Sequence, residues 1–256
     1  MARRVIIQVQ DLVGGYGDET ILDQVSFEVY EGEIFVILGG SGCGKSTLLK
    51  HMVGLNRPWS GRVIIDGDDI SVDDDLVYRR ALTKFGVLYQ SSALLGSMTL
   101  AENVALPILE YTDLPHQHVA TLVRMKLNLV NLDGYEGYLP SELSGGMRKR
   151  AGLARAMALN PKILFFDEPS AGLDPVTSAG LDNLILRLNR SLGTTMVLVT
   201  HELQSILAVA HRVIMLDKNA KGIIAEGDPR FLRDHSLNPF VHQFFNRLPE
   251  DHPGKS

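Results

Sequence analysis

"GGSGCGKST", residues 39–47, decides the fold of this chain. Gly39, Gly44, Lys45 and Ser46 fit the phosphate-binding pattern G-x-x-x-x-G-K-[ST]. Glycines let the backbone wrap closely around a phosphate with its N–H groups turned inward, and a helix starting near Lys45 adds its positive end. Lys45 would contact the outer phosphates, and the Ser46 hydroxyl would bind Mg²⁺. The stretch therefore predicts a nucleotide site.

A strand and a helix flank this loop. "EIFVIL" (33–38) indicates a strand, and "SGCGKSTLLKHMVGL" (41–55) has apolar residues at the helical positions 48, 49, 52, 53 and 55. A strand, a glycine-rich loop and a helix in that order form the first unit of an α/β nucleotide-binding fold. Cys43, inside the loop, has two interpretations: a small side chain that fits, or a thiol made reactive by the helix start.

Further strand patterns lie on both sides of a helical segment. Residues 5–36 and 62–70 have short strand patterns, with Asp66-Gly67 as a hairpin turn signal. Strand patterns return in "KILFFDE" and "TTMVLVTHE", which a helical stretch from Val176 to Leu192 separates, and then in "HRVIMLD" and "GIIAEGD".

We expect this pattern to give a β/α core interrupted by a helical insert. The expected core covers residues 1–90 and 159–232, the helical insert covers 91–158, and a C-terminal tail covers 233–256. In the tail, Phe240, Phe244 and Phe245 have helical spacing, and they could dock either on this domain or on a second copy of the chain.

Composition limits the classes of function. The chain has 256 residues, 45% hydrophobic and 21% charged, and a net charge of −5, which gives no electrostatic footprint for nucleic acid. Its single cysteine cannot build a disulfide framework and favours a reducing compartment. No apolar run approaches the roughly 20 residues of a membrane-spanning helix, so we expect a membrane role to require a partner.

Two carboxylates follow the apolar strand pattern "ILFF". Asp167 and Glu168 would be costly at the end of a buried strand unless they bind something. In a P-loop enzyme the aspartate holds Mg²⁺ and the adjacent glutamate can position and deprotonate the attacking water. His201 likewise follows a strand, "MVLVT", expected beside the P-loop strand, so we expect it to contact the terminal phosphate.

The remaining acidic and histidine residues have plainer interpretations. The run from Asp66 to Asp75 lacks the glutamate of an EF-hand loop, so we expect a solvated turn. We expect structural roles for the other seven histidines, including His116 and His118.

A second glycine-rich anion cradle, Ser144-Gly145-Gly146, lies in "ELSGGMRKRAGLARAMAL". Ser144 is a good N-cap residue, the glycines permit close backbone approach, and the following helix would aim its positive end outward. Because the chain has only one P-loop lysine and one acid pair, we expect this cradle to act on the nucleotide of another chain.

Six motifs in order resemble the ATP-binding-cassette (ABC) family over about residues 5–230. They are "GGSGCGKST" (Walker A), Gln90 (Q-loop), "LSGGM" (signature), "ILFFDE" (Walker B), "SAGLD" (D-loop) and His201 (switch histidine). The resemblance implies a P-loop (RecA-like) α/β core with an antiparallel β subdomain and an inserted α-helical subdomain. It also implies a head-to-tail dimer in which each ATP lies between the P-loop of one chain and the signature of the other.

The resemblance implies a role for each motif residue. The ATP contacts would be Tyr16, Gly39, Gly40, Ser41, Gly42, Cys43, Gly44, Lys45, Ser46 and Thr47. Tyr16 would stack on adenine, unless it is a core residue. The catalytic residues of this ATP hydrolase would be Glu168, His201 and Gln90, and the Mg²⁺ ligands Ser46, Gln90 and Asp167. Ser144, Gly145, Gly146 and Met147 would contact the partner's ATP, and Asp174 belongs to the D-loop.

Met147 stands where many cassettes have Gln, and with the neighbouring sequence it resembles cassettes of MCE-linked phospholipid transporters of the Mla type. That resemblance implies a peripheral place on the cytoplasmic face of the inner membrane, an MlaE-like permease and an MCE-domain protein, and it admits a STAS-domain protein. The segment from Tyr89 to Met98 would face the permease. Two alternatives remain open: an ABC system for an amino acid, metal or organic solvent, and a soluble ABC ATPase of the iron–sulfur assembly type.

Overall fold

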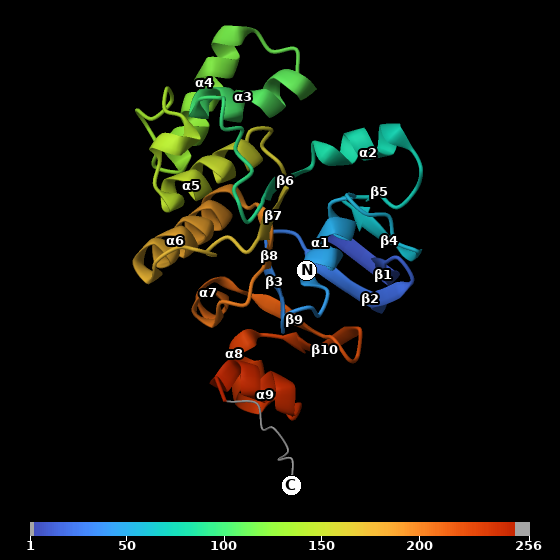
Figure 1. Ribbon diagram of the computed structural model, residues 1–256. Helices are drawn as coiled ribbons and strands as arrows, with labels where there is room; N and C mark the ends of the chain where they lie inside the picture. The colour runs from blue at the N-terminus through green and yellow to red at the C-terminus, as the bar shows by residue number, and fades with distance from the viewer. Residues whose placement is uncertain (1–2, 249–256) are drawn as a thin grey trace.

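Two sheets build the fold of the computed structural model, which describes residues 3–248 (Figure 1). One sheet is antiparallel, and its four strands have the order β2-β1-β4-β5. These strands are β1 (Val5–Tyr16), β2 (Glu19–Tyr30), β4 (Ser60–Ile65) and β5 (Asp68–Asp69). Asp66 and Gly67 form the tight turn between β4 and β5, both with positive φ, as the sequence predicted.

The second sheet has six strands in the order β10-β9-β3-β8-β7-β6. The strands from β9 to β6 are parallel, and β10 pairs antiparallel with β9. Their bounds are β3 (Ile34–Gly39), β6 (Phe85–Leu88), β7 (Ile163–Asp167), β8 (Thr195–Val199), β9 (Arg212–Asp217) and β10 (Gly222–Gly227). Every residue of β3 and β8 is buried, which explains their unbroken apolar runs.

The two faces of the six-stranded sheet contribute to two different hydrophobic cores. Alternate residues of β3 divide between them: Ile34, Val36 and Leu38 face one core, and Phe35 and Ile37 face the other. The second core also contains apolar residues of the antiparallel sheet and of α1 (Lys45–Met52), so α1 is packed between the two sheets.

The first core is covered by helices. Helices α3 (Leu100–Tyr111), α4 (His116–Leu129) and α5 (Gly145–Ala156) pack on one another and gather at one end of the molecule (Figure 1). Thr99 starts α3 with a reciprocal capping box with Glu102. The other helical elements are α2 (Asp75–Leu82), η1 (Pro140–Glu142), α6 (Pro175–Leu192), α7 (Leu203–Val209), α8 (Pro229–His235) and α9 (Pro239–Asn246).

Helix α9 docks on the chain's own core, one of the two expected positions for the tail. Val241 and Phe245 are buried in the first core, and Phe244 packs against it. Phe240 remains 49% exposed. Residues 249–256 of the predicted tail lie outside the described residues.

The acidic run is the expected solvated segment only in part, because Asp73, Asp74 and Asp75 are exposed but Asp66 and Asp68 are not. The Asp66 and Asp68 side chains are each only 7% exposed. Asp66 pairs with Arg4 and Lys162, and Asp68 accepts a hydrogen bond from Arg80 Nε at 3.0 Å and pairs with Lys84 at 2.6 Å. These cations lie 12 or more residues from their partners, so local sequence gave no sign of the pairing.

Three further details of the secondary structure differ from what the sequence pattern predicted. The sequence did not indicate α2 or β6, because the eight residues of α2 contain only one buried side chain and β6 has only four residues. Leu55, assigned to the apolar face of the first helix, lies beyond the end of α1 and is 56% exposed.

The pairing of Asp68 gives a stability prediction. The hydrogen bond from Arg80, followed by the hydrogen bond and the charge of Lys84, lowers the pKa of Asp68 to about 2. A carboxylate with a depressed pKa stabilises the fold above its unfolded pKa and loses that contribution as pH falls through the folded value. Asp68→Asn should therefore lower the free energy of unfolding at pH 7 by about 1–2 kcal/mol.

Urea unfolding of both proteins between pH 7 and pH 2 would measure this difference. It should shrink between about pH 4 and pH 2, where wild type also loses the ion pair. Asp73→Asn, at an ion pair whose side chains are 60% and 81% exposed, is the control and should change stability little. A pH-independent deficit in Asp68→Asn would contradict the assignment.

Candidate nucleotide-binding site

The glycine-rich loop joins the end of β3 to the start of α1, as predicted. Gly39 ends the strand with φ +149°, and a Cβ at this position would lie 2.3 Å from the Leu216 carbonyl oxygen of the adjacent β9. Only glycine permits that approach. The N-cap of α1, Gly44, has no side chain to cap the helix, so the first N–H groups of α1 are left to a ligand.

Lys45 is folded over this loop. Its Nζ donates hydrogen bonds to the carbonyl oxygens of Gly39 and Gly40, each at 2.9 Å. An ammonium held above the amides of a helix start forms a positive cradle for phosphate oxygens.

A cleft of about 740 Å³ opens above the loop. It brings together residues from distant parts of the chain at the carboxyl edge of the parallel strands, where ligands of open α/β sheets bind. Its lining residues are Tyr16, Ile21, Gly39, Gly40, Ser41, Gly42, Gly44, Lys45, Ser46, Thr47, Gln90, Glu168, His201 and Phe244. Most residues expected to contact ATP thus surround one cavity.

Cys43 is part of the loop but does not line this cleft. The Cys43 side chain is 2% exposed, and burial raises the pKa of its thiol. A buried, protonated thiol is unreactive, so the interpretation as a small side chain that fits is supported and the reactive-thiol alternative is not.

Asp167 and Glu168 present unsatisfied oxygen atoms at the end of β7. Asp167 Oδ1 and Glu168 Oε2 are buried and have no hydrogen-bond partner among the described residues. Burial, and then the neighbouring Glu168 charge, raise the pKa of Asp167. Such orphaned carboxylate oxygens fit a hard cation such as Mg²⁺.

The donor set also suits magnesium in its composition. Residues 3–248 contain no group of three or more His, Cys, Asp or Glu side chains arranged to hold a metal. Mg²⁺ typically uses one or two carboxylates together with substrate phosphates and water, so a full protein cage is not required. Asp167, the Ser46 hydroxyl and Gln90 are the side chains that would hold it.

His201 holds the second carboxylate. Its Nδ1 lies 2.8 Å from Glu168 Oε1, and β8, the strand that precedes His201, pairs with both β3 and β7. Glu168 has a positive φ of 45°, an uncommon conformation for a residue other than glycine, and its N–H donates to the Val199 carbonyl at 2.8 Å. Backbone and side chain together aim Glu168 at the cleft.

Tyr16 lies at the rim of the cleft and is 50% exposed, so it is not a core residue. Its hydroxyl accepts hydrogen bonds from Thr47 Oγ1 at 3.5 Å and from Lys50 Nζ at 3.3 Å. The Thr47 hydrogen bond lowers the pKa of Tyr16. A flat ring held at the rim next to the phosphate loop is suited to stacking on a nucleobase.

The second cradle lies outside this cleft. Ser144 caps α5 by accepting from the Met147 N–H at 3.3 Å, and Asp174 caps α6 by accepting from the N–H groups of Val176 and Thr177. None of residues 144–147 or Asp174 lines the cleft around the P-loop. The P-loop and the second glycine-rich helix start are therefore two separate parts of the chain.

The family model for ABC transporters matches residues 22–171, which include the P-loop (39–47) and the signature segment (144–147). The chain belongs to the ABC transporter family of ATP-hydrolysing subunits.

Curated relatives of this ABC ATPase match nearly its whole length. A "probable ribonucleotide transport ATP-binding protein mkl" of Mycobacterium leprae is 42% identical over 96% of this chain and 70% of its own. The "intermembrane phospholipid transport system ATP-binding protein MlaF" of Escherichia coli K12 is 38% identical over 96% of this chain and 90% of its own.

Solved structures agree with the predicted α/β P-loop fold. A dimeric structure of MJ0796, described as a bacterial ABC transporter cassette, has a TM-score of 0.79 and 30% identity over 87% of this chain and 98% of its own. A second structure of that cassette, a dimeric post-hydrolysis state bound to ADP and Pi, has a TM-score of 0.78 and 29% identity over the same shares of the two chains.

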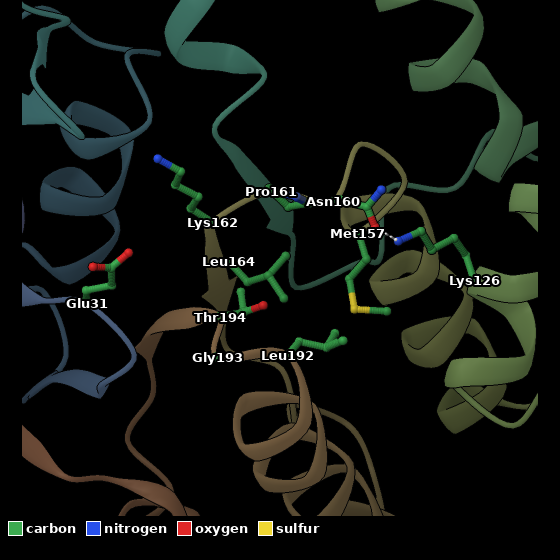
Figure 2. A pocket seen from close by; sticks show the side chains of 10 residues that line it. All are labelled: Glu31, Lys126, Met157, Asn160, Pro161, Lys162, Leu164, Leu192, Gly193 and Thr194. Carbon is green, nitrogen blue, oxygen red and sulfur yellow. Dashed lines mark hydrogen bonds between the residues drawn. The ribbon is translucent and has the colours of Figure 1, made fainter. Parts of the chain in front are cut away.

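A second cavity is separate from the nucleotide cleft. A cavity of about 280 Å³ lies beside the amino ends of β7 and β8 and is lined by residues such as Lys126, Asn160 and Thr194 (Figure 2). It shares no residue with the nucleotide cleft.

In the described part of the chain, no helix has the length and apolar character needed to cross a membrane.

Sequence reasoning missed two kinds of residue at the site. Phe244 lines the cleft from α9, although its helical spacing in the tail was visible. Lys149 and Arg155 of α5 donate hydrogen bonds to backbone carbonyls next to the cleft. A side chain that acts on backbone groups leaves no residue-type pattern in the segment it holds.

The position of Tyr16 gives a binding prediction. Tyr16→Ala should weaken ATP binding by roughly 5- to 100-fold, as expected for loss of one base-stacking platform, while Tyr16→Phe keeps the ring and the affinity. Equilibrium titration with a fluorescent ATP analogue measures both. Tyr111→Ala, an exposed tyrosine at the end of α3, is the control. Equal affinities for wild type and Tyr16→Ala would remove Tyr16 from the site.

Proposed function

We propose that this ABC ATPase subunit drives phospholipid transport in an MCE-linked system of the Mla type. The mechanistic part of the proposal is carried by one observation: the P-loop cleft and the signature cradle are both present in the chain but do not meet. The cargo is supported by the similarity to MlaF over nearly the full length of both chains.

Each half-site would be completed by a second copy. Ser144, Gly145 and Gly146 at the start of α5 would face the nucleotide held by the partner's P-loop, with Asp174 nearby at the start of α6. The dimeric MJ0796 structures support such a pair of cassettes. Within this chain, a Cβ on Gly146 would lie 2.5 Å from Thr177 Cγ2, whereas one on Gly145 would meet Leu173 at an ordinary 3.5 Å.

The chain's own groups would then perform the hydrolysis. Asp167, Ser46 and Gln90 would hold Mg²⁺, which would supply positive charge next to the phosphate oxygens. Lys45 would leave the Gly39 and Gly40 carbonyls to bind the outer phosphates. Glu168 would accept a proton from the attacking water, and His201 would keep its carboxylate in place and contact the terminal phosphate.

The surface for the membrane partner would lie around the Q-loop and α3. Ala93 is exposed, and Leu95, Leu106 and Leu109 are 42%, 39% and 48% exposed. Exposed apolar side chains of this kind suit a short helix of an MlaE-like permease. On this proposal the subunit lies on the cytoplasmic face of the inner membrane, with an MCE-domain protein in the complex and a STAS-domain protein as a further partner.

The cargo is the point on which the relatives differ. The names of the relatives refer to ribonucleotide transport for mkl, phospholipid transport for MlaF and methionine import for MetN of Geobacillus kaustophilus, which is 39% identical over 91% of this chain and 68% of its own. Met147 and the sequence around the signature favour the phospholipid system. In this mechanism the residues of the ATPase subunit do not contact the cargo, so the cargo has to be identified through the membrane partner.

Co-purification from native membranes in mild detergent tests the cargo. Recovery of an MlaE-like permease, an MCE-domain protein and bound phospholipid would support the proposal. A different permease would keep the ATPase mechanism and replace the cargo. Leu95→Asp should lose the permease, while Leu192→Asp, 50% exposed at the end of α6, should keep it. Recovery of no membrane protein with any variant would contradict the proposal and favour a soluble ABC ATPase.

Glu168→Gln tests the proposed base. The variant should bind ATP with near-normal affinity and lose about 10²- to 10⁴-fold in turnover, because glutamine cannot accept the proton. Phosphate release at saturating ATP measures turnover. Near-normal hydrolysis would remove Glu168 from this role.

Gly145→Phe tests the shared site. On a Glu168→Gln background, the added ring should leave ATP binding by the monomer intact and prevent the ATP-dependent dimer, because it fills the proposed partner cradle. Light scattering after size-exclusion chromatography measures the dimer. Gly137→Phe is the control, since a Cβ there meets no atom within 4 Å. An ATP-dependent dimer of Gly145→Phe would overturn the shared-site arrangement.

A further inference from the structure

Two cations of α5 hold the backbone of the Q-loop. Lys149 Nζ donates to the Gln90 carbonyl at 2.6 Å. Arg155 donates to the carbonyls of Ser92 and Ala93, at 3.0 and 2.7 Å. Ser92 and Ala93 both have positive φ, so this part of the loop is a strained turn that the hydrogen bonds hold.

Lys149 also contacts the acid pair. The same Nζ lies 3.3 Å from the carbonyl oxygen of Glu168 and donates to it. The Glu168 N–H already donates to Val199 of β8. The backbone of Glu168, in its uncommon left-handed conformation, is therefore fixed by one hydrogen bond from the sheet and one from α5.

Burial makes this lysine unusual. Lys149 is 5% exposed, and burial lowers the pKa of its ammonium, while the charges of Asp167 and Glu168 oppose that effect. Both of its hydrogen-bond acceptors are neutral carbonyls, and it forms no ion pair within 4.0 Å among residues 3–248. Burying a cation without a paired anion costs free energy. Lys149 nevertheless donates its hydrogen bonds to two segments beside the nucleotide cleft, at Gln90 and at Glu168.

We propose that Lys149 is a positioning residue that sets Gln90 and Glu168 relative to each other and to α5. Helix α5 begins with Gly145 and Gly146 of the signature, and Lys149 follows one turn later. A displacement of the helix start by the partner's nucleotide would reach the chain's own Glu168 through this side chain. The inference rests on the proposed roles of Gln90 and Glu168 and adds a link between the two half-sites.

Lys149→Met removes the donors and keeps the length of the side chain. We expect kcat at saturating Mg-ATP to fall about 10- to 100-fold, the size of effect that follows a small misplacement of reacting groups. The equilibrium Kd for ATP should change by less than about threefold, because Lys149 does not line the cleft. Lys149→Arg, which keeps a cationic donor, should retain at least about a third of the wild-type rate.

Lys126→Met is the matched control. Lys126 is also 5% exposed, its Nζ donates to a neutral group, Asn160 Oδ1, and it lies at the separate cavity of Figure 2. The Lys126→Met variant should lower the melting temperature to a similar extent as Lys149→Met and leave kcat within about twofold of wild type. A loss of rate due only to the removal of a buried lysine would appear in both variants.

Three outcomes would overturn the inference: kcat of Lys149→Met within about threefold of wild type, an equal loss of kcat in Lys126→Met, or a Lys149→Arg variant as slow as Lys149→Met. Glu168→Gln, assayed in parallel, separates this failure from that of the proposed function. If Glu168→Gln abolishes turnover while Lys149→Met does not, the hydrolytic role of Glu168 stands and the positioning role of Lys149 falls.

Discussion

The turn at the end of β3 is the constraint on which the rest of the molecule depends. Gly39 leaves the sheet so close to the Leu216 carbonyl that no side chain fits, and the chain then enters α1 between the two sheets. Because β3 pairs in parallel with β8, and β8 pairs in parallel with β7, all three strands end at the same edge of the sheet. Glu168 and His201, which follow β7 and β8, line the cleft above the phosphate loop for that reason, and Asp167 is the last residue of β7.

The residues that could be predicted from the sequence are those whose chemistry is local. The loop from Gly39 to Thr47 and the acid pair can be recognised from their residue types and from the strand patterns that precede them. The place of His201 required one further step, the expectation that β8 lies beside β3, and the strand order confirms it. The fold class followed from the same patterns, and the cassette structures agree with it.

Long-range packing determines the environments of charged residues that could not be predicted from the sequence. The carboxylates of Asp66 and Asp68 looked solvated because their cations come from distant segments. Nothing in the sequence pattern marked Lys149, yet it is buried and donates a hydrogen bond to the Gln90 carbonyl of the Q-loop. In each case a backbone or side-chain partner far along the chain changed the environment of a charge, and periodicity carries no information about such partners.

The strand order also has a consequence for the making of the protein. Strand β3 lies between β8 and β9, whose residues come more than 150 positions later in the chain. At about 5–20 residues per second, a ribosome would present this fully apolar strand for roughly 8–30 seconds before either neighbour exists. The newborn chain must shield "IFVIL" through that interval, so the strand that leads into the glycine-rich loop is exposed to misassociation during synthesis.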